Sequence, residues 1–339
     1  MEKILSIIIP TYNMERYLSK CLSSLIIPDE KLLKSLEVLV VNDGSKDNSS
    51  KIAHEFETKY PDTFRVIDKE NGNYGSCINR GLKEATGKYI KVLDADDYFN
   101  TDNFTQYLHS LKEVDVDLII TDYDLVTETG AIKETRSFIL PPRTPMLLQE
   151  HMRDIFNIQM HAITYRTRIL KEERYVQQEG ISHTDAEWVF YPMIRVTTIY
   201  YINDVVYEYL VGRTGQTVDL TVWANKASDR ERIARREVEY FEKIKISNIK
   251  DSILPFLSYR ILTELHGIYL TYLIIKRDEK HTRQLDDFLH HTSPVLFTQI
   301  EERRLHDKYM PIKYIKSWRK KGKLPSGILS YLYCKIKKI

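Results

Sequence analysis

Three carboxylates within four residues follow an apolar run, and this stretch is the part of the sequence best suited to chemistry. The run begins near Tyr89 and stops at Asp94, Asp96 and Asp97. Carboxylates this close repel one another, so folded proteins keep them where a cation binds them or where water solvates them. The stretch is therefore either a divalent-cation site or a solvated turn that caps a helix beginning near Thr101. The acidic cluster alone does not decide between these interpretations.

The first hundred residues alternate short apolar runs with segments of helical spacing, which predicts an α/β fold with a mostly parallel sheet between helices. The predicted strands cover residues 4–9, 36–41, 64–67 and 89–93. Polar residues follow two of them, at Thr11–Asn13 and at Asn42–Ser45, as the acids follow the fourth. Carboxyl ends of parallel strands meet at one edge of a sheet, where open α/β proteins bind ligands. We expect these side chains to line one crevice of the kind a nucleotide requires, which favours the cation site.

The rest of the chain changes from mixed structure to helices. We expect a strand over 117–123, an irregular hairpin over 124–145, a short helix near 147–156, strands over 161–165 and 198–202, and long helices over 226–245 and 253–276. This pattern predicts an α/β catalytic domain over residues 1–220 and a helical C-terminal region over residues 221–339.

Composition and charge exclude several classes of protein. The chain has 339 residues, 42% of them hydrophobic and 29% charged, and no apolar run approaches the length of a membrane span. The N-terminus does not resemble a secretory signal, so we expect a cytoplasmic protein. Three scattered cysteines support neither a disulfide framework nor a zinc site. Residues 1–307 carry 40 basic and 48 acidic side chains, which argues against a nucleic-acid-binding body.

The C-terminal tail has the opposite charge. From Lys308 to the end there are ten lysine or arginine residues and no acid, interleaved with aliphatic and aromatic residues. Such a tail can lie on an anionic membrane surface, which would place the protein peripherally at the inner face of the cell membrane. The alternatives are a solvated helical tail and a tail that packs on a partner subunit. The sequence does not set the oligomeric state.

Four ordered motifs carry a resemblance to a known family. They are Ser6–Asn13, Val41–Ser49, Asn79–Gly81 with Ala85–Tyr89, and Leu93–Asp97. With them the chain resembles the inverting, nucleotide-sugar-dependent glycosyltransferases of family 2, which have the GT-A fold. The resemblance is close over roughly the first 100 residues and looser to about residue 220.

The resemblance implies a UDP-sugar donor and assigns residues to it. The implied donor contacts are Pro10, Thr11, Tyr12, Asn13, Asp43 on the uracil, Asn79, Asp94, Ala95, and Arg213 with Gln216 over the diphosphate. Asp96 is implied as the direct ligand of Mn²⁺ or Mg²⁺, while Asp94 contacts the ribose or binds the metal through water. A cation there would stabilise the charge of the leaving diphosphate. Asp97 could instead cap the next helix, and Arg213 could be a solvated loop residue.

An inverting transfer also needs a base on the acceptor side. The family places an aspartate at the start of a later helix, commonly in an acidic pair, and this chain has Asp185 and Glu187 there, with Thr184 as a predicted cap. Asp185 is our first choice for the base and Glu187 the second. The alternative is that both are favourable charges in a first helical turn. The neighbouring Trp188 could stack on an acceptor sugar or belong to the core.

The predicted function is transfer of a hexose or N-acetylhexosamine from a UDP-sugar to a sugar hydroxyl of a surface polysaccharide or glycoprotein glycan. The acceptor would be a glycan or a lipid-linked or protein-linked saccharide. One alternative is a sugar-nucleotide nucleotidyltransferase, although Pro10–Asn13 does not provide its Gly-rich basic loop. The other is a non-catalytic module that binds glycans or nucleotides.

Overall fold

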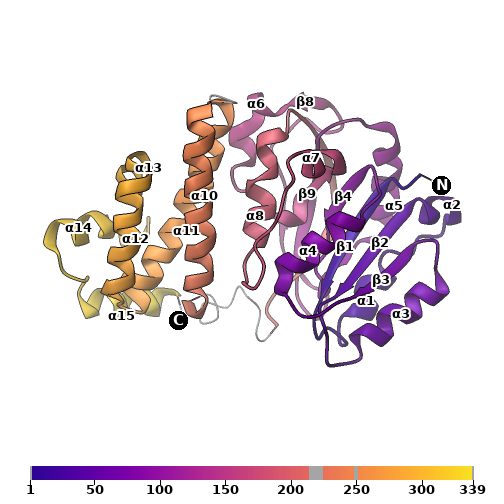
Figure 1. Cartoon of the computed structure of the whole chain (residues 1–339), viewed down its shortest axis with the longest axis horizontal. Helices are drawn as coiled ribbons and strands as arrows, with labels where there is room; N and C mark the ends of the chain where they lie inside the picture. Colours follow the sequence, from indigo (N-terminus) through magenta and orange to yellow (C-terminus); the bar gives the residue numbers. More distant parts are fainter. Residues whose placement is uncertain (1, 214–223, 248–250, 338–339) are drawn as a thin grey trace. The chain divides into compact units, whose positions relative to one another are not determined.

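The computed structural model describes residues 2–213, 224–247 and 251–337, which belong to two compact units, Met1–Thr214 and Gly215–Ile339. The first unit contains the sheet and the second is built of helices (Figure 1). The predicted domain boundary near residue 220 lies outside the described residues.

The amino-terminal half of the sheet is parallel, as predicted. Its strands are β3 (Phe64–Asp68), β2 (Leu36–Asn42), β1 (Leu5–Thr11) and β4 (Tyr89–Val92), in that spatial order. Almost every residue of β1 and β2 is buried, which explains why both strands read as continuous apolar runs.

The sheet continues with antiparallel additions that the sequence indicated less clearly. Strand β9 (Ile163–Arg166) lies antiparallel between β4 and β6 (Leu118–Val126), and β6 pairs in parallel with β10 (Thr198–Leu210). Three short strands complete the sheet. Strands β5 (Tyr98–Phe99) and β8 (Pro145–Leu147) pair antiparallel with β10, and β7 (Ile132–Arg136) pairs antiparallel with β6. Register shifts interrupt β10 between Ile202 and Tyr207 and break its alternation of side chains, which explains why the sequence predicted a strand over 198–202 only.

Helices flank this sheet (Figure 1). They are α1 (Leu18–Ser23), α2 (Glu30–Lys34), α3 (Ser49–Lys59), α4 (Asn73–Glu84), α5 (Thr101–Glu113), α6 (Leu148–His151), α7 (Thr167–Glu172) and α8 (Asp185–Phe190). Helix α4 packs on β1 and β2 and buries Cys77, Ile78 and Leu82. The side chain of Asn100 caps α5 by accepting a hydrogen bond from the Asn103 amide, at 3.2 Å. The interpretation in which Asp97 caps this helix is therefore wrong.

The second unit is helical, as the sequence predicted. Its helices are α10 (Ala227–Ser247), α11 (Leu254–Leu270) with a π-helical turn over Thr271–Ile275, α12 (Glu279–Thr292), α13 (Pro294–Ile300), α14 (Tyr314–Lys321) and α15 (Gly327–Lys337). Within the described residues, none of the chain's helices has the length and apolar character needed to cross a membrane.

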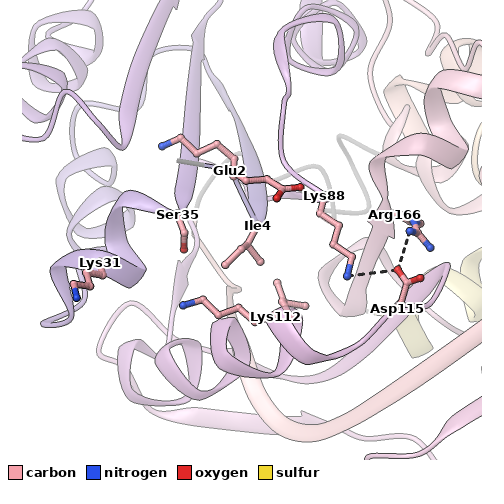
Figure 2. Close-up of a pocket in the computed structure, with 10 residues that line it drawn as sticks. Glu2, Ile4, Lys31, Ser35, Lys88, Lys112, Asp115 and Arg166 are labelled. Carbon is pink, nitrogen blue, oxygen red and sulfur yellow. Dashed lines mark ion pairs between the residues drawn. The ribbon is translucent and has the colours of Figure 1, made fainter.

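A cavity of about 730 Å³ lies at the amino ends of β1, β2 and β4, opposite the end where the polar residues gather (Figure 2). It is lined by several cations, but Lys88 and Arg166 both pair with Asp115, at 3.5 and 2.8 Å. Another, Lys3, donates hydrogen bonds to backbone carbonyls of Lys34 and Leu36, at 2.8 and 2.9 Å. These cations stabilise the fold, and the cavity does not share in the site at the other end of the strands.

Candidate active site

The polar ends of β1, β2 and β4 meet at one rim of the sheet, as the sequence predicted. The amide of Asp43 donates to the carbonyl of Thr11, at 2.8 Å, and ties the ends of β1 and β2 together. At the end of β4, Asp94 Oδ1 accepts a hydrogen bond from the hydroxyl of Tyr74 on α4, at 2.9 Å. The acidic loop is therefore held within the sheet and is not a solvated surface turn.

Asp97 joins this loop to β10. Its side chain is 1% exposed, and its two oxygens accept hydrogen bonds from the Tyr207 hydroxyl at 2.5 Å and from the Leu210 amide at 2.8 Å. The same Tyr207 hydroxyl accepts a hydrogen bond from the Asp94 amide, at 3.2 Å. Asp97 and Tyr207 together fix the position of the acidic loop.

Burial and mutual repulsion raise the pKa values of Asp94 and Asp97. The pKa of Asp94 is raised from 3.8 to about 7, mainly by burial and then by the charges of Asp96 and Asp185, although the Tyr74 hydrogen bond and Arg213 act in the opposite direction. Burial also raises the pKa of Asp97 well above its usual range, with Asp96 and Asp94 adding to the effect. Ionising both acids without a counter-charge therefore costs free energy, and a bound cation would reduce this cost.

Replacing Asp94 with asparagine tests whether the charge of this carboxylate destabilises the folded protein. A folded state with a raised carboxyl pKa binds the proton more tightly than the unfolded chain, so the wild type loses stability as pH rises from about 4 to about 7 and no further above that. Asp94→Asn removes this loss of stability, because the asparagine side chain does not ionise. The difference in free energy of unfolding between Asp94→Asn and the wild type should therefore grow in favour of the variant by about 2 to 3 kcal/mol from about pH 5 to about pH 7.5. Urea unfolding in the presence of a chelator measures this, and an equal difference at both pH values contradicts it.

Asp96 forms an ion pair with one of the predicted diphosphate-binding residues. Arg213 Nε lies 2.6 Å from Asp96 Oδ2, and both side chains are largely shielded from solvent. The Arg213 guanidinium also lies over the ring of Tyr17, with its central carbon 5.6 Å from the ring centre. The interpretation of Arg213 as a solvated loop residue is therefore wrong. The other predicted residue of this segment, Gln216, lies outside the described residues.

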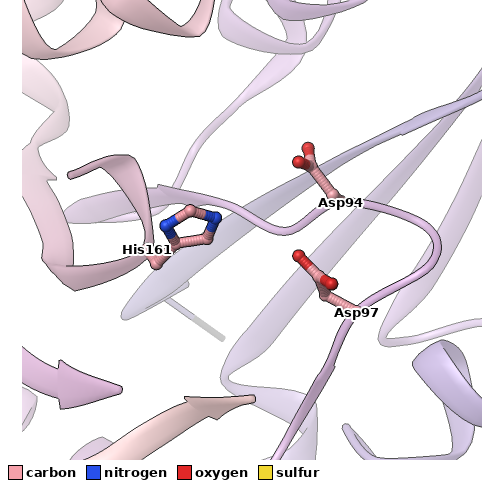
Figure 3. Close-up of side chains that lie close together, drawn as sticks. All are labelled: Asp94, Asp97 and His161. Atoms are coloured by element: carbon pink, nitrogen blue, oxygen red, sulfur yellow. The ribbon is translucent and has the colours of Figure 1, made fainter. Parts of the chain in front are cut away.

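His161 is a member of the site that the sequence did not reveal. The potential ligand atoms of Asp94, Asp97 and His161 all lie within 4.8 Å of one another, and Figure 3 shows the imidazole beside the two carboxylates. Burial, with a further effect of Lys91, lowers the pKa of His161 to about 3, so its ring is neutral near pH 7. Its Nδ1 atom is buried and has no hydrogen-bond partner among the described residues.

This donor set fits a divalent cation. Carboxylate oxygens and a neutral imidazole nitrogen are ligands that Mn²⁺ accepts, and carboxylates suit Mg²⁺. The sequence assigned the cation to Asp96 and Asp94, whereas the structure groups Asp94 with Asp97 and His161 and pairs Asp96 with Arg213. Which of these carboxylates binds the cation directly stays a prediction.

The two candidate bases differ in their surroundings. Asp185 is the first residue of α8, and its carboxylate makes no hydrogen bond or ion pair within the described part of the chain. Its charge helps to raise the pKa values of Asp94, Tyr74 and Tyr209, so it shares the rim with the acidic loop. Glu187 is fully buried and accepts hydrogen bonds from the backbone and side-chain amides of Gln178, at 2.7 and 2.9 Å. These contacts give Glu187 a structural role, and the assignment of the catalytic base to Asp185 or Glu187 stays a prediction.

Asn79 connects α4 to the segment before α8. Its side chain accepts a hydrogen bond from the Gln177 amide and donates one to Glu179, both at 2.8 Å. A Cβ atom at Gly75 would lie 1.9 Å from the Gln178 carbonyl oxygen, so only glycine permits this close packing on α4. Asn79 therefore helps to position the chain that leads to Asp185, and its predicted donor contact stays a prediction.

Most of the remaining predicted donor residues lie at the ends of β1 and β2. Asp43 is buried, and its Oδ1 accepts hydrogen bonds from Lys69 Nζ at 2.6 Å and from the Gly72 amide at 2.9 Å. Tyr12 is exposed, and Asn13 adopts a left-handed φ of 54° while its side chain accepts a hydrogen bond from the Lys46 amide at 2.7 Å. Pro10 and Thr11 are the last two residues of β1, and Ala95 lies in the acidic loop that follows β4. Their contacts with a donor stay predictions.

Comparison with known proteins shows which family the chain belongs to. Residues 6–174 match the profile described as glycosyl transferase family 2. The uncharacterized glycosyltransferase MG025 of Mycoplasma genitalium is 32% identical over 237 residues, which cover 66% of this chain and 72% of that protein. The chain belongs to glycosyltransferase family 2. A more distant relative, the uncharacterized glycosyltransferase RP339 of Rickettsia prowazekii, is 26% identical over 262 residues, covering 75% of this chain and 78% of that protein.

Solved structures confirm the architecture of the enzyme. Residues 1–349 of S. aureus TarS, crystallised in complex with UDP-GlcNAc, match with a TM-score of 0.66 and 19% sequence identity. The match covers 94% of this chain and 92% of that one. It confirms the predicted GT-A fold of the transferase and its C-terminal helices.

The structure decides between the two alternatives for Trp188 and shows how α8 of the enzyme begins. Trp188 is 1% exposed and packs edge-to-face against Tyr165 and Tyr175, with ring centres 5.6 and 5.9 Å apart, so it belongs to the core and cannot stack on a sugar. Thr184 precedes the first residue of α8, but its side chain makes no capping hydrogen bond. The helix is held instead by its buried face and by Glu187.

Proposed function

We propose that the enzyme transfers a hexose or N-acetylhexosamine from a UDP-sugar to a sugar hydroxyl, with inversion and with dependence on a divalent cation. The acceptor is a surface polysaccharide or a glycoprotein glycan, presented as a lipid-linked or protein-linked saccharide. The observation that carries this proposal is the position of Asp185, whose carboxylate has no partner among the described residues and shares a rim with the buried acids and Arg213.

Each part of the rim has a role in this reaction. Asp185 accepts the proton of the acceptor hydroxyl as that oxygen attacks the anomeric carbon from the face opposite the departing UDP. Arg213, now paired with Asp96, supplies a cation close to the departing diphosphate. The strand ends at Thr11–Asn13 and Asp43 bind the nucleoside. A divalent cation held by the aspartates of the acidic loop, with His161 available as a further ligand, would stabilise negative charge on the leaving group.

The alternatives receive less support. Family membership makes the protein a transferase, and it retains both the acidic loop and a candidate base, which argues against a non-catalytic module. A nucleotidyltransferase would need a Gly-rich basic loop after β1, and the residues there are Pro10–Asn13. A cytoplasmic location at the inner face of the cell membrane is part of the proposal.

A screen of UDP-sugars tests the reaction. Because TarS shares the fold and was crystallised with UDP-GlcNAc, that donor should be tried first. We expect UDP release that requires Mn²⁺ or Mg²⁺ and that increases when saccharide acceptors are added. The product should have the anomeric configuration opposite to that of the donor sugar, as nuclear magnetic resonance can show. Retention of configuration, or no UDP release from any UDP-sugar, contradicts the proposal.

A further inference from the structure

Helix α15 presents an apolar face to solvent in the second unit. Ile328, Tyr331, Leu332 and Ile336 are exposed by 73%, 65%, 44% and 41%, respectively. Their spacing of three, four and eight residues from Ile328 places them on one side of the helix. Large apolar side chains exposed together in this way mark an interaction surface, whereas single ones need no explanation.

The opposite side of α15 is fixed to its own unit. Ser330 and Tyr333 are buried, and the helix packs against the π-helical turn that follows α11. Arg277 Nη1 donates to the Pro325 carbonyl at 2.8 Å and to the Ser330 hydroxyl at 3.1 Å. The apolar face is therefore held in an outward orientation by the fold.

The cations of this region form two groups. One group balances acids of the same unit: Arg319 pairs with Asp286 at 2.5 Å and with Glu301 at 3.2 Å, and Lys316 lies 3.8 Å from Glu301. The other group, Lys320, Lys321, Lys323 and Lys335, is exposed and has no ion pair within the described residues. No acidic residue occurs from Lys308 to the end of the chain. Lys335 lies on α15 itself and Lys323 lies four residues before it, so positive charge without an acidic partner among the described residues adjoins the apolar face in the sequence.

We infer that α15 and these four lysines bind the surface of an anionic lipid bilayer. A bilayer of this kind offers an apolar layer for Ile328 and Leu332, an interfacial layer for the amphipathic ring of Tyr331, and negative headgroups for the lysines. The eleven residues of α15 are too few to span a membrane, which requires about 20, so the helix lies in the plane of the interface. This inference deepens the membrane location included in the proposed function, because it names the helix and the kind of lipid surface, and it does not depend on the proposed reaction.

Cosedimentation of the full-length protein with vesicles tests the inference. We expect binding to phosphatidylcholine vesicles that contain about one third phosphatidylglycerol, little binding to phosphatidylcholine alone, and weakening by salt. Tyr331→Ser with Leu332→Ser should weaken binding about tenfold or more by removing apolar contact. Lys320→Gln, Lys321→Gln and Lys323→Gln together should weaken it about 100-fold, at about fivefold for each lysine.

A matched control separates this face from exposed apolar residues in general. Ile132 and Ile139, in the first unit, are exposed by 63% and 92%, and their replacement with serine should leave vesicle binding unchanged. Thermal melts verify that all variants are folded. The inference fails if the wild type does not bind the anionic vesicles, or if the α15 variant binds them as well as the control does. It also fails if the α15 substitutions dissociate an oligomer, measured by light scattering, without changing vesicle binding.

Discussion

Asp185→Asn is expected to lower the turnover number for sugar transfer by about 10²- to 10⁴-fold, the contribution typical of a general base. Asparagine keeps the size of the side chain but cannot accept the proton of the attacking hydroxyl. Because the Asp185 carboxylate has no hydrogen bond or ion pair with the described residues, its loss should leave the fold intact. Steady-state kinetics measures the effect, and calorimetry should show UDP affinity close to that of the wild type.

Glu187→Gln is the matched control for this variant, because it removes the other carboxylate of the same helix. Glu187 is buried and accepts two hydrogen bonds from Gln178, so its replacement should lower the free energy of unfolding by about 1 to 3 kcal/mol. The folded fraction should turn over at nearly the wild-type rate. Near wild-type turnover of Asp185→Asn, together with an inactive but stable Glu187→Gln, would show that the roles of these two residues are reversed.

Asp96→Asn is expected to lower the turnover number by about 10²- to 10³-fold, as the loss of one group that stabilises transition-state charge does. The asparagine oxygen can still accept the hydrogen bond of Arg213, so the loop should keep its conformation while losing a negative charge. The concentration of Mn²⁺ that gives half-maximal activity should rise. A titration of activity with Mn²⁺ measures both effects.

Asp97→Asn distinguishes the two possible ligand groups. Both Asp97 oxygens already accept hydrogen bonds, from Tyr207 and Leu210, so this variant should lose stability and keep the cation requirement of the wild type. If Asp97→Asn weakens the response to Mn²⁺ and Asp96→Asn does not, the cation belongs with Asp94, Asp97 and His161.

The parallel half of the sheet and its polar rim could be predicted because their signals are local. Strands buried on both faces give unbroken apolar runs, as in β1 and β2, and parallel strands all end at the same edge of the sheet. The meeting of Thr11, Asp43 and Asp94 follows from these two facts. The predicted approach of Asp185 to this rim rested on family resemblance, because nothing local to residue 185 indicates where α8 lies.

The inner lining of the site could not be predicted, since its residues have the pattern of core positions. Tyr74 and Tyr207 lie on a buried helix face and on a strand, where aromatic residues are expected regardless of function, yet their hydroxyls bind the acids. His161 precedes an apolar strand and gives no sign that its ring lies beside Asp94 and Asp97. The burial of Glu187 depends on Gln178, whose path is fixed by tertiary packing on α4. Such contacts are set by the fold and leave no periodic signal in the sequence.

The central claim is that the acidic loop holds a cation for the diphosphate of a UDP-sugar. Calorimetric titration of UDP into the wild-type protein, in the presence of Mn²⁺ and again with a chelator, tests it most directly. We predict that Mn²⁺ tightens UDP binding by about tenfold or more, because the cation neutralises both the diphosphate and the buried acids. Equal affinity for UDP with and without the cation would contradict the account.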